Sequence, residues 1–157
     1  MGPLRGVAAG LVIGAALFAA GLGAPTWAES PPSAACRSWN GPPVQSRSLF
    51  TCFYEASRRA SAAVGRQVAF ETQDRASDAT AAAFANAATV ASDALVNLAA
   101  EPGGASALAG LTEVRIAAGA EPSATRADQV ITVVIVPSRS SAGLPTIAQI
   151  ERAATGR

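Results

Sequence analysis

Hydrophobic residues recur at helical spacing in three stretches of this chain. From Ser46 or Ser48 to Val64, apolar side chains fall on one face and Gly65 follows, which predicts a helix. An alanine-rich stretch from Asp74 or Ser77 to about residue 100 predicts a long second helix, and residues 145–154 predict a short third one. The side chains expected to face the core are Leu49, Phe53, Ala56, Ala60, Val64, Phe84, Ala88, Ala91, Leu95, Leu98, Ile147, Ile150 and Ala154.

Three other stretches have the patterns of strands. Residues 67–72 and 111–118 alternate apolar and polar side chains, as a strand buried on one face does. Residues 130–136 are consecutively β-branched, which predicts a strand that is apolar on both faces and therefore central. We expect loops over residues 119–128 and 138–143.

The order of these elements, α-β-α-β-β-α, predicts a small α+β domain with a three-stranded mixed sheet, one long alanine-rich helix and two shorter helices. The long helix between strands 67–72 and 111–118 indicates that these two strands are parallel. The loop after residue 118 indicates that strand 130–136 is antiparallel to strand 111–118. Placing strand 130–136 between the other two satisfies both expectations.

The first 28 residues read as a secretory signal peptide. Arg5 is followed by an uninterrupted apolar stretch over residues 6–24 and by the small residue Ala28. We expect cleavage after Ala28; the alternative is an uncleaved membrane anchor, since the stretch approaches the length of a bilayer span. Residues 29–45, rich in Pro, Ser and Gly, then precede a single domain over residues 46–157, and the protein is expected to be periplasmic or secreted.

Cys36 and Cys52 are the only cysteines of the chain. In an exported protein two cysteines most often form one disulfide, and a spacing this wide does not match a redox pair. We therefore predict a Cys36–Cys52 bond that tethers the segment 29–45 to the first helix.

The composition excludes several classes of function. The chain has no histidine and no lysine, so it can build neither a Ser-His-Asp triad, nor a histidine-ligated metal site, nor a P-loop. Its 12 basic residues face 11 acidic ones, and a net charge of +1 gives no general attraction to nucleic acid. We predict no metal, no cofactor and no nucleic-acid partner, and no stable membrane association if the signal is cleaved.

Two groups of polar residues are candidates for chemistry. Glu71, Asp74 and Asp78 could act as general acid and base in a hydrolase, although helix capping also explains the two aspartates. Arg139 with Ser140 and Ser141 follows the most apolar strand, where such residues could bind a carboxylate or phosphate; an ordinary solvated loop is the alternative.

The leading hypothesis is a small exported, non-enzymatic envelope or secreted domain that binds a protein partner or a small ligand. A lysine-free sequence rich in Ala and Arg further suggests a bacterium with a GC-rich genome. The alternatives are a carboxylate-dependent hydrolase of the cell envelope and a periplasmic domain anchored by residues 6–24. Pairing of an edge strand with another chain, including a homodimer, is compatible with the predicted sheet.

Overall fold

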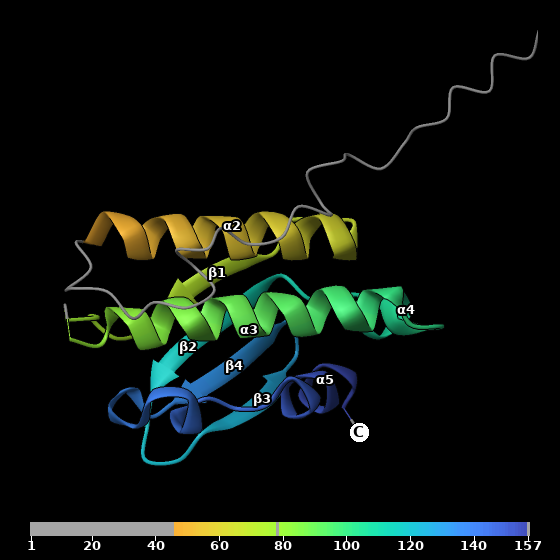
Figure 1. Ribbon diagram of the computed structural model, residues 1–157. Helices are drawn as coiled ribbons and strands as arrows, with labels where there is room; N and C mark the ends of the chain where they lie inside the picture. The colour runs from red at the N-terminus through yellow and green to blue at the C-terminus, as the bar shows by residue number, and fades with distance from the viewer. Residues whose placement is uncertain (1–45, 78, 157) are drawn as a thin grey trace, which may run out of the picture.

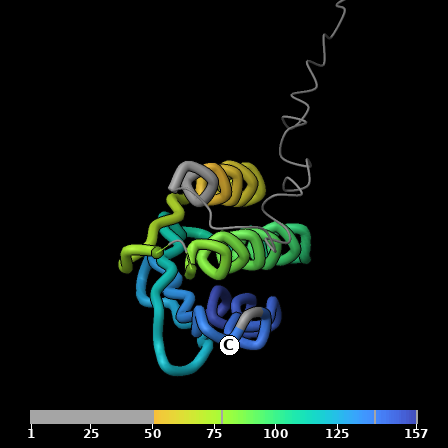
Figure 2. The backbone as a smooth tube through the Cα atoms, turned by 60° about the vertical axis from the view of Figure 1, so that its left-hand side comes forward, coloured from red at the N-terminus to blue at the C-terminus, as the bar shows by residue number. Residues whose placement is uncertain are grey.

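A mixed four-stranded sheet carries all the helices of the described domain on one face (Figures 1 and 2). The computed structural model describes residues 46–77 and 79–156. In chain order the elements are α2 (Ser46–Val64), β1 (Ala69–Thr72), α3 (Ala81–Ala100), α4 (Gly104–Ala107), β2 (Glu113–Ala118), β3 (Ser123–Ala127), β4 (Val130–Ile135), the 3₁₀ helix η2 (Pro137–Gly143) and α5 (Ile147–Thr155).

The strand order is β1-β2-β4-β3. β1, β2 and β4 are mutually parallel, and β3 is antiparallel to β4 at the edge. The predicted α+β class with a mixed sheet is confirmed, as is the parallel direction of the two strands joined by the long helix, although these strands pair directly instead of flanking a third. The prediction of three strands with residues 130–136 in the middle, antiparallel to strand 111–118, was wrong.

The error comes from residues 123–127, which the sequence pattern assigns to a loop and which form β3. This strand reads Ser-Ala-Thr-Arg-Ala and has no large apolar side chain, so it lacks the alternation that identifies a strand. Because β3 turns back on β4 through two residues, Asp128 and Gln129, it reverses the chain before β4 begins. β4 can therefore run parallel to β2 instead of antiparallel to it.

The core fills the space between the helices and the sheet. α2 packs on α3, α3 packs on β2 and β4, and α5 packs on α3 and β3. The predicted inward stripe of α3 is confirmed, and Gly65 ends α2 with a positive φ of 75°. Buried side chains of the core include Phe53, Val68, Phe84, Leu95, Leu98, Val114, Ile116, Ile131, Val133, Ile135 and Ile150.

Three local predictions differ from the structure. α3 begins at Ala81 rather than near Asp74 or Ser77, because Ser77 and Thr80 hydrogen-bond to each other in a turn that precedes the helix. Residues 137–143 form η2 rather than an irregular loop. Ile147, expected to face the core, is 37% exposed because it begins α5 at the molecular surface.

α2 and α3 run in the same direction (Figure 1). An ion pair joins the two helices. Arg59 of α2, only 9% exposed, donates to Ser92 Oγ at 3.0 Å and to Asp93 Oδ1 at 2.6 Å on α3. Alanine dominates α3, and the buried Ala56 and Ala60 of α2 are also small, which leaves room for this close approach. Within the described part of the chain, the search for an apolar helix of membrane-spanning length finds none.

Candidate functional site

The carboxylates proposed as catalytic residues lie near the ends of the parallel strands. Glu71 and Asp74 are both exposed. Asp74 Oδ2 accepts a hydrogen bond from the backbone N–H of Ala118 at 2.7 Å, so this side chain fastens the loop after β1 to the end of β2. Asp78 lies outside the described residues. Nowhere in ranges 46–77 and 79–156 do three or more His, Cys, Asp or Glu side chains group as a metal site requires.

The predicted ligand loop of Arg139, Ser140 and Ser141 lies in η2, which packs against α3. Arg139 and Ser141 are exposed. The segment closes on itself through backbone bonds, since Val136 N donates to Gly143 O at 2.8 Å and Arg139 N donates to Val136 O at 3.0 Å. Anion binding by these residues stays a prediction.

Cys52 is buried in α2, with 2% of its surface exposed, and contacts Ala85 of α3. Its predicted partner Cys36 lies outside the described residues, so the disulfide stays a prediction. The position of Cys52 nevertheless fixes where such a bond would attach residues 29–45, namely at the helical layer.

The described helices and strands leave the face of the sheet opposite the helices uncovered (Figure 2). We call it the open face. Strand register assigns side chains to it in three rows, because directly paired residues point to the same side. The rows are Ala69, Glu113, Val130 and Ala127; Glu71, Arg115, Thr132 and Thr125; and Ala117, Val134 and Ser123.

Charge divides the open face into two halves. On β2, Glu113 and Arg115 form an ion pair in which Arg115 Nε and Nη2 both lie 2.7 Å from Glu113 Oε1. Glu71 of β1 is the register partner of Arg115 and adds a second carboxylate. The half formed by β4 and β3 carries no charged side chain in these rows.

The outward side chains of β4 do not suit a permanently solvated face. Val130 and Val134 flank Thr132 there, and all three are half-buried. A strand with one wet face normally alternates apolar and polar residues, whereas apolar residues on both sides are typical of a strand covered twice. Sequence analysis predicted double coverage for these residues, and the structure covers only the side of Ile131, Val133 and Ile135.

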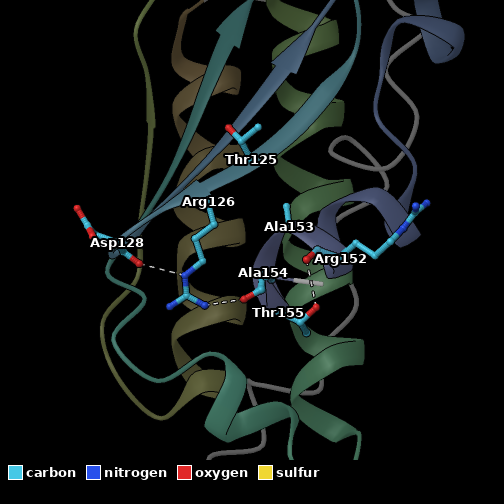
Figure 3. A pocket seen from close by; sticks show the side chains of 8 residues that line it. Thr125, Arg126, Asp128, Arg152, Ala153, Ala154 and Thr155 are labelled. Carbon is cyan, nitrogen blue, oxygen red and sulfur yellow. Dashed lines mark hydrogen bonds between the residues drawn. The ribbon is translucent and has the colours of Figure 1, made fainter.

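A shallow hollow lies at the opposite end of the domain from η2, between β3 and the last turn of α5 (Figure 3). It is widely open, with a volume of about 590 Å³. Arg126 lies in its centre, and Figure 3 shows Arg152 and Asp128 directed away from it. The Arg126 guanidinium donates to four carbonyl oxygens, those of Ala107, Ala109, Asp128 and Ala154.

Sequence reasoning missed both β3 and the role of Arg126. The available signal in the sequence was the Asp128-Gln129 pair, which lies between residues 123–127 and 130–135. In the structure Asp128 adopts a positive φ of 52°. Aspartate tolerates this conformation and is common in two-residue hairpin turns. The usual Asp-Gly or Asn-Gly pair is absent here, so the turn is recognisable only once the pairing is known.

The fold and the open face define a two-layer α+β domain with one uncovered side of the sheet. Residues 14–154 match the family model described as a domain of unknown function, DUF4908, and the chain belongs to this family. The match begins inside the predicted signal peptide and covers the described domain as far as Ala154. No curated protein and no solved structure is significantly similar to the chain.

Proposed function

We propose that this chain is a small exported, non-enzymatic domain that binds a protein partner through the open face. The observation that carries the proposal is the outward apolar character of β4. Val130 and Val134 lie on a central strand, on either side of Thr132, on a sheet face that no described helix or strand covers, although Gly119 of the loop after β2 lies against Val134. Covering them removes apolar surface from water, which is the main favourable term in protein association.

The shape of the surface favours a protein over a small molecule. Small-molecule sites are concave and enclose most of the ligand, whereas the open face is one side of a sheet. The open face has a charged half around Arg115 and a neutral half around Thr132, and protein interfaces likewise combine polar and apolar surface. The hollow near Arg126 is widely open, and most N–H groups of that guanidinium already bind carbonyl oxygens.

The preceding segment of the chain is a poor candidate to cover this face. α2 begins at Ser46 on the helical layer, and the predicted bond from Cys36 to Cys52 would hold residues 36–46 on the same layer. Residues 29–35 would then be the only free part of the exported chain before the tether. Seven residues extend at most about 25 Å, which is barely the distance around a two-layer domain.

Export rests on residues 1–28 and on the expected disulfide. The proposal therefore places the domain in the periplasm or outside the cell, where a partner would be another exported or membrane-bound protein. A homodimer through the open face is the alternative occupant, and the experiment below distinguishes the two.

Site-specific photo-crosslinking in the producing cell tests the proposal. A photoreactive residue at Thr132, in the centre of the open face, is expected to form a discrete crosslinked species. The same residue at Asn97, exposed on α3 in the helical layer, is the control and is expected not to form it. Val130→Arg should abolish the Thr132 crosslink while leaving the fold intact, because the Val130 side chain is only half-buried and begins the strand.

The mass of the crosslinked species decides the occupant. A heterologous protein identified by mass spectrometry supports the proposal, and a species of twice the chain mass replaces the partner by a second copy. Equal crosslinking from Thr132 and Asn97, or none from Thr132, contradicts a binding role for the open face.

A further inference from the structure

The hydrogen bonds at the two ends of the β2–β4 pair show which neighbouring strand each backbone N–H and C=O group faces. Glu113 N donates to Gln129 O, and Gly119 N donates to Ile135 O. β4 therefore directs the backbone groups of its odd-numbered residues toward β2. Because alternate residues direct their N–H and C=O to opposite sides, the even-numbered residues of β4 face β3.

On β3 the same alternation identifies the groups at the free edge. Ser123, Thr125 and Ala127 are the register partners of the even-numbered residues of β4, so their backbone groups face β4. Ala124 and Arg126 consequently direct their N–H and C=O groups outward. Among residues 46–77 and 79–156, no other backbone group forms a hydrogen bond with the outward N–H and C=O groups of Ala124 and Arg126.

α2 covers the start of the opposite edge of the sheet, at the residue that precedes β1. Ala69 N donates to Thr112 O, so the neighbouring residue Val68 directs its backbone groups away from β2. Ser61 Oγ accepts from Val68 N at 2.9 Å, and Ser57 Oγ donates to Val68 O at 2.6 Å. Two serine side chains thus occupy the backbone groups of Val68, whereas Phe70 and Thr72 of β1 direct theirs outward.

β3 is short and its one charged side chain points inward, but it lacks the other features that usually protect an edge strand. Its register with β4 is continuous and contains no bulge, and the strand has no proline. Its single charged side chain, Arg126, is turned to the helical face and bound to carbonyl oxygens of its own chain. The β3 edge is therefore regular and carries no charged side chain that points outward.

The free edge also borders the hollow beneath the last turn of α5 (Figure 3). Thr125 and Arg126 line it from β3, and Ala153, Thr155 and Gly156 line it from α5. An edge strand beside a helix is the arrangement in which an added strand gains backbone bonds on one side and side-chain contacts on the other.

We propose that the β3 edge binds an extended peptide segment of a protein partner as a fifth strand of the sheet. The outward N–H and C=O groups of Ala124 and Arg126 match an extended backbone. The hollow, lined by the small residues Thr125, Ala153, Thr155 and Gly156 around Arg126, fits small side chains at alternate positions of the peptide. This site is separate from the open face and does not depend on it.

A second copy of the chain is a poorer occupant of the same edge. α5 packs against both α3 and β3, so a β3–β3 pair would bring two α5 helices onto two adjacent strands. Helices are about 10 Å wide, whereas neighbouring strands lie about 4.8 Å apart. A single peptide strand brings no such helix.

Selection from a phage-displayed library of linear 12-residue peptides on the oxidised exported chain tests the proposal. Selected peptides, made synthetically, are expected to bind the Ala124→Pro variant about tenfold or more weakly, because proline removes an outward N–H and adds a ring at the edge. Thr72→Pro makes the same change at an outward position of β1 and is the matched control, expected to bind normally.

N-methylation of the peptide provides a readout that does not depend on folding of a variant. Methyl groups at alternate residues should abolish binding, and methyl groups at the residues between them should be tolerated. Failure to select any peptide, equal binding by Ala124→Pro, or insensitivity to the methylation pattern overturns the proposal. A chain dimer that Ala124→Pro dissociates also overturns it in favour of a second copy. None of these results changes crosslinking from Thr132, which tests the open face separately.

Discussion

Arg126 Nη1 donates a hydrogen bond to the carbonyl oxygen of Ala154, 2.6 Å away, and so ties the edge strand to the last turn of α5. The same nitrogen donates to Ala107 O at 2.7 Å, and Nη2 donates to Ala109 O at 3.1 Å. The carbonyl groups at a helix C-terminus lack intrahelical partners and carry partial negative charge. One guanidinium therefore satisfies the ends of α4 and α5 together.

Arg126→Ala is expected to lower the free energy of unfolding by about 2–3 kcal/mol, because it removes several charge-assisted hydrogen bonds at once. Arg126→Lys should recover only part of this loss, since an ammonium group cannot reproduce the planar fork. Urea denaturation followed by circular dichroism measures both. Arg152→Ala, exposed in the same turn of α5, is the control and should change stability by less than about 0.5 kcal/mol. Equal stability of Arg126→Ala and the wild type would show that water replaces these bonds.

The ion pair between α2 and α3 predicts an asymmetric response to mutation. Arg59 is almost fully buried, whereas the Asp93 side chain is 37% exposed. Asp93→Ala leaves a buried guanidinium without its carboxylate and should cost about 1–3 kcal/mol. Arg59→Met leaves only a partly solvated carboxylate and should cost less than about 1 kcal/mol.

Chemical denaturation of both variants in the same buffer decides this prediction. Arg59 Nε is already buried without a hydrogen-bond partner among the described residues, which is a further reason why methionine should be tolerated. A larger loss for Arg59→Met than for Asp93→Ala would mean that packing of the long side chain, not charge, dominates at this contact.

The fold could be predicted from the sequence wherever burial of apolar side chains determines the structure. The stripe from Phe84 to Leu98 faces the core because apolar spacing alone decides which side of a helix is buried. β3 was not predictable in this way, since Ser123–Ala127 is held by backbone pairing with β4 and buries little apolar surface. Missing that strand reversed the expected direction of β4, so a local omission became an error of topology.

The surface features were less accessible from the sequence than the core. The outward valines of β4 were recognised as apolar, but the sequence could not show that one face lacks a cover. The free edge at Ala124 depends on strand register, and the closed edge at Val68 depends on Ser57 and Ser61, which lie on a different element. Such relationships between distant residues leave no local pattern.

Ser57 and Ser61 are predicted to protect the β1 edge as well as stabilise it. Ser61→Ala leaves the N–H of the fully buried Val68 without its acceptor, and the double variant with Ser57→Ala also removes a bond to its carbonyl oxygen. The double variant should lose about 1–3 kcal/mol of stability and associate at high concentration. Ser106→Ala, exposed on α4, is the matched control.

Unfolding curves and light scattering across a concentration series check both parts of this prediction. Destabilisation without association would show that the two serines stabilise the fold but do not protect the β1 edge. Association by Ser106→Ala to the same degree would show that the effect does not come from the β1 edge.

The predicted tether at Cys52 has a measurable consequence for the exported protein. Intact-mass analysis should find a chain that begins at Glu29 and takes up no alkylating reagent until it is reduced, after which it takes up two equivalents. Joint replacement of Cys36 and Cys52 by serine should lower the free energy of unfolding by about 3 kcal/mol, as expected for opening a loop of this length. Two alkylated thiols in the unreduced protein would disprove the bond. A mass that includes residues 1–28 would instead support the uncleaved anchor, in which case residues 29–45 would link the membrane to the helical layer of the domain.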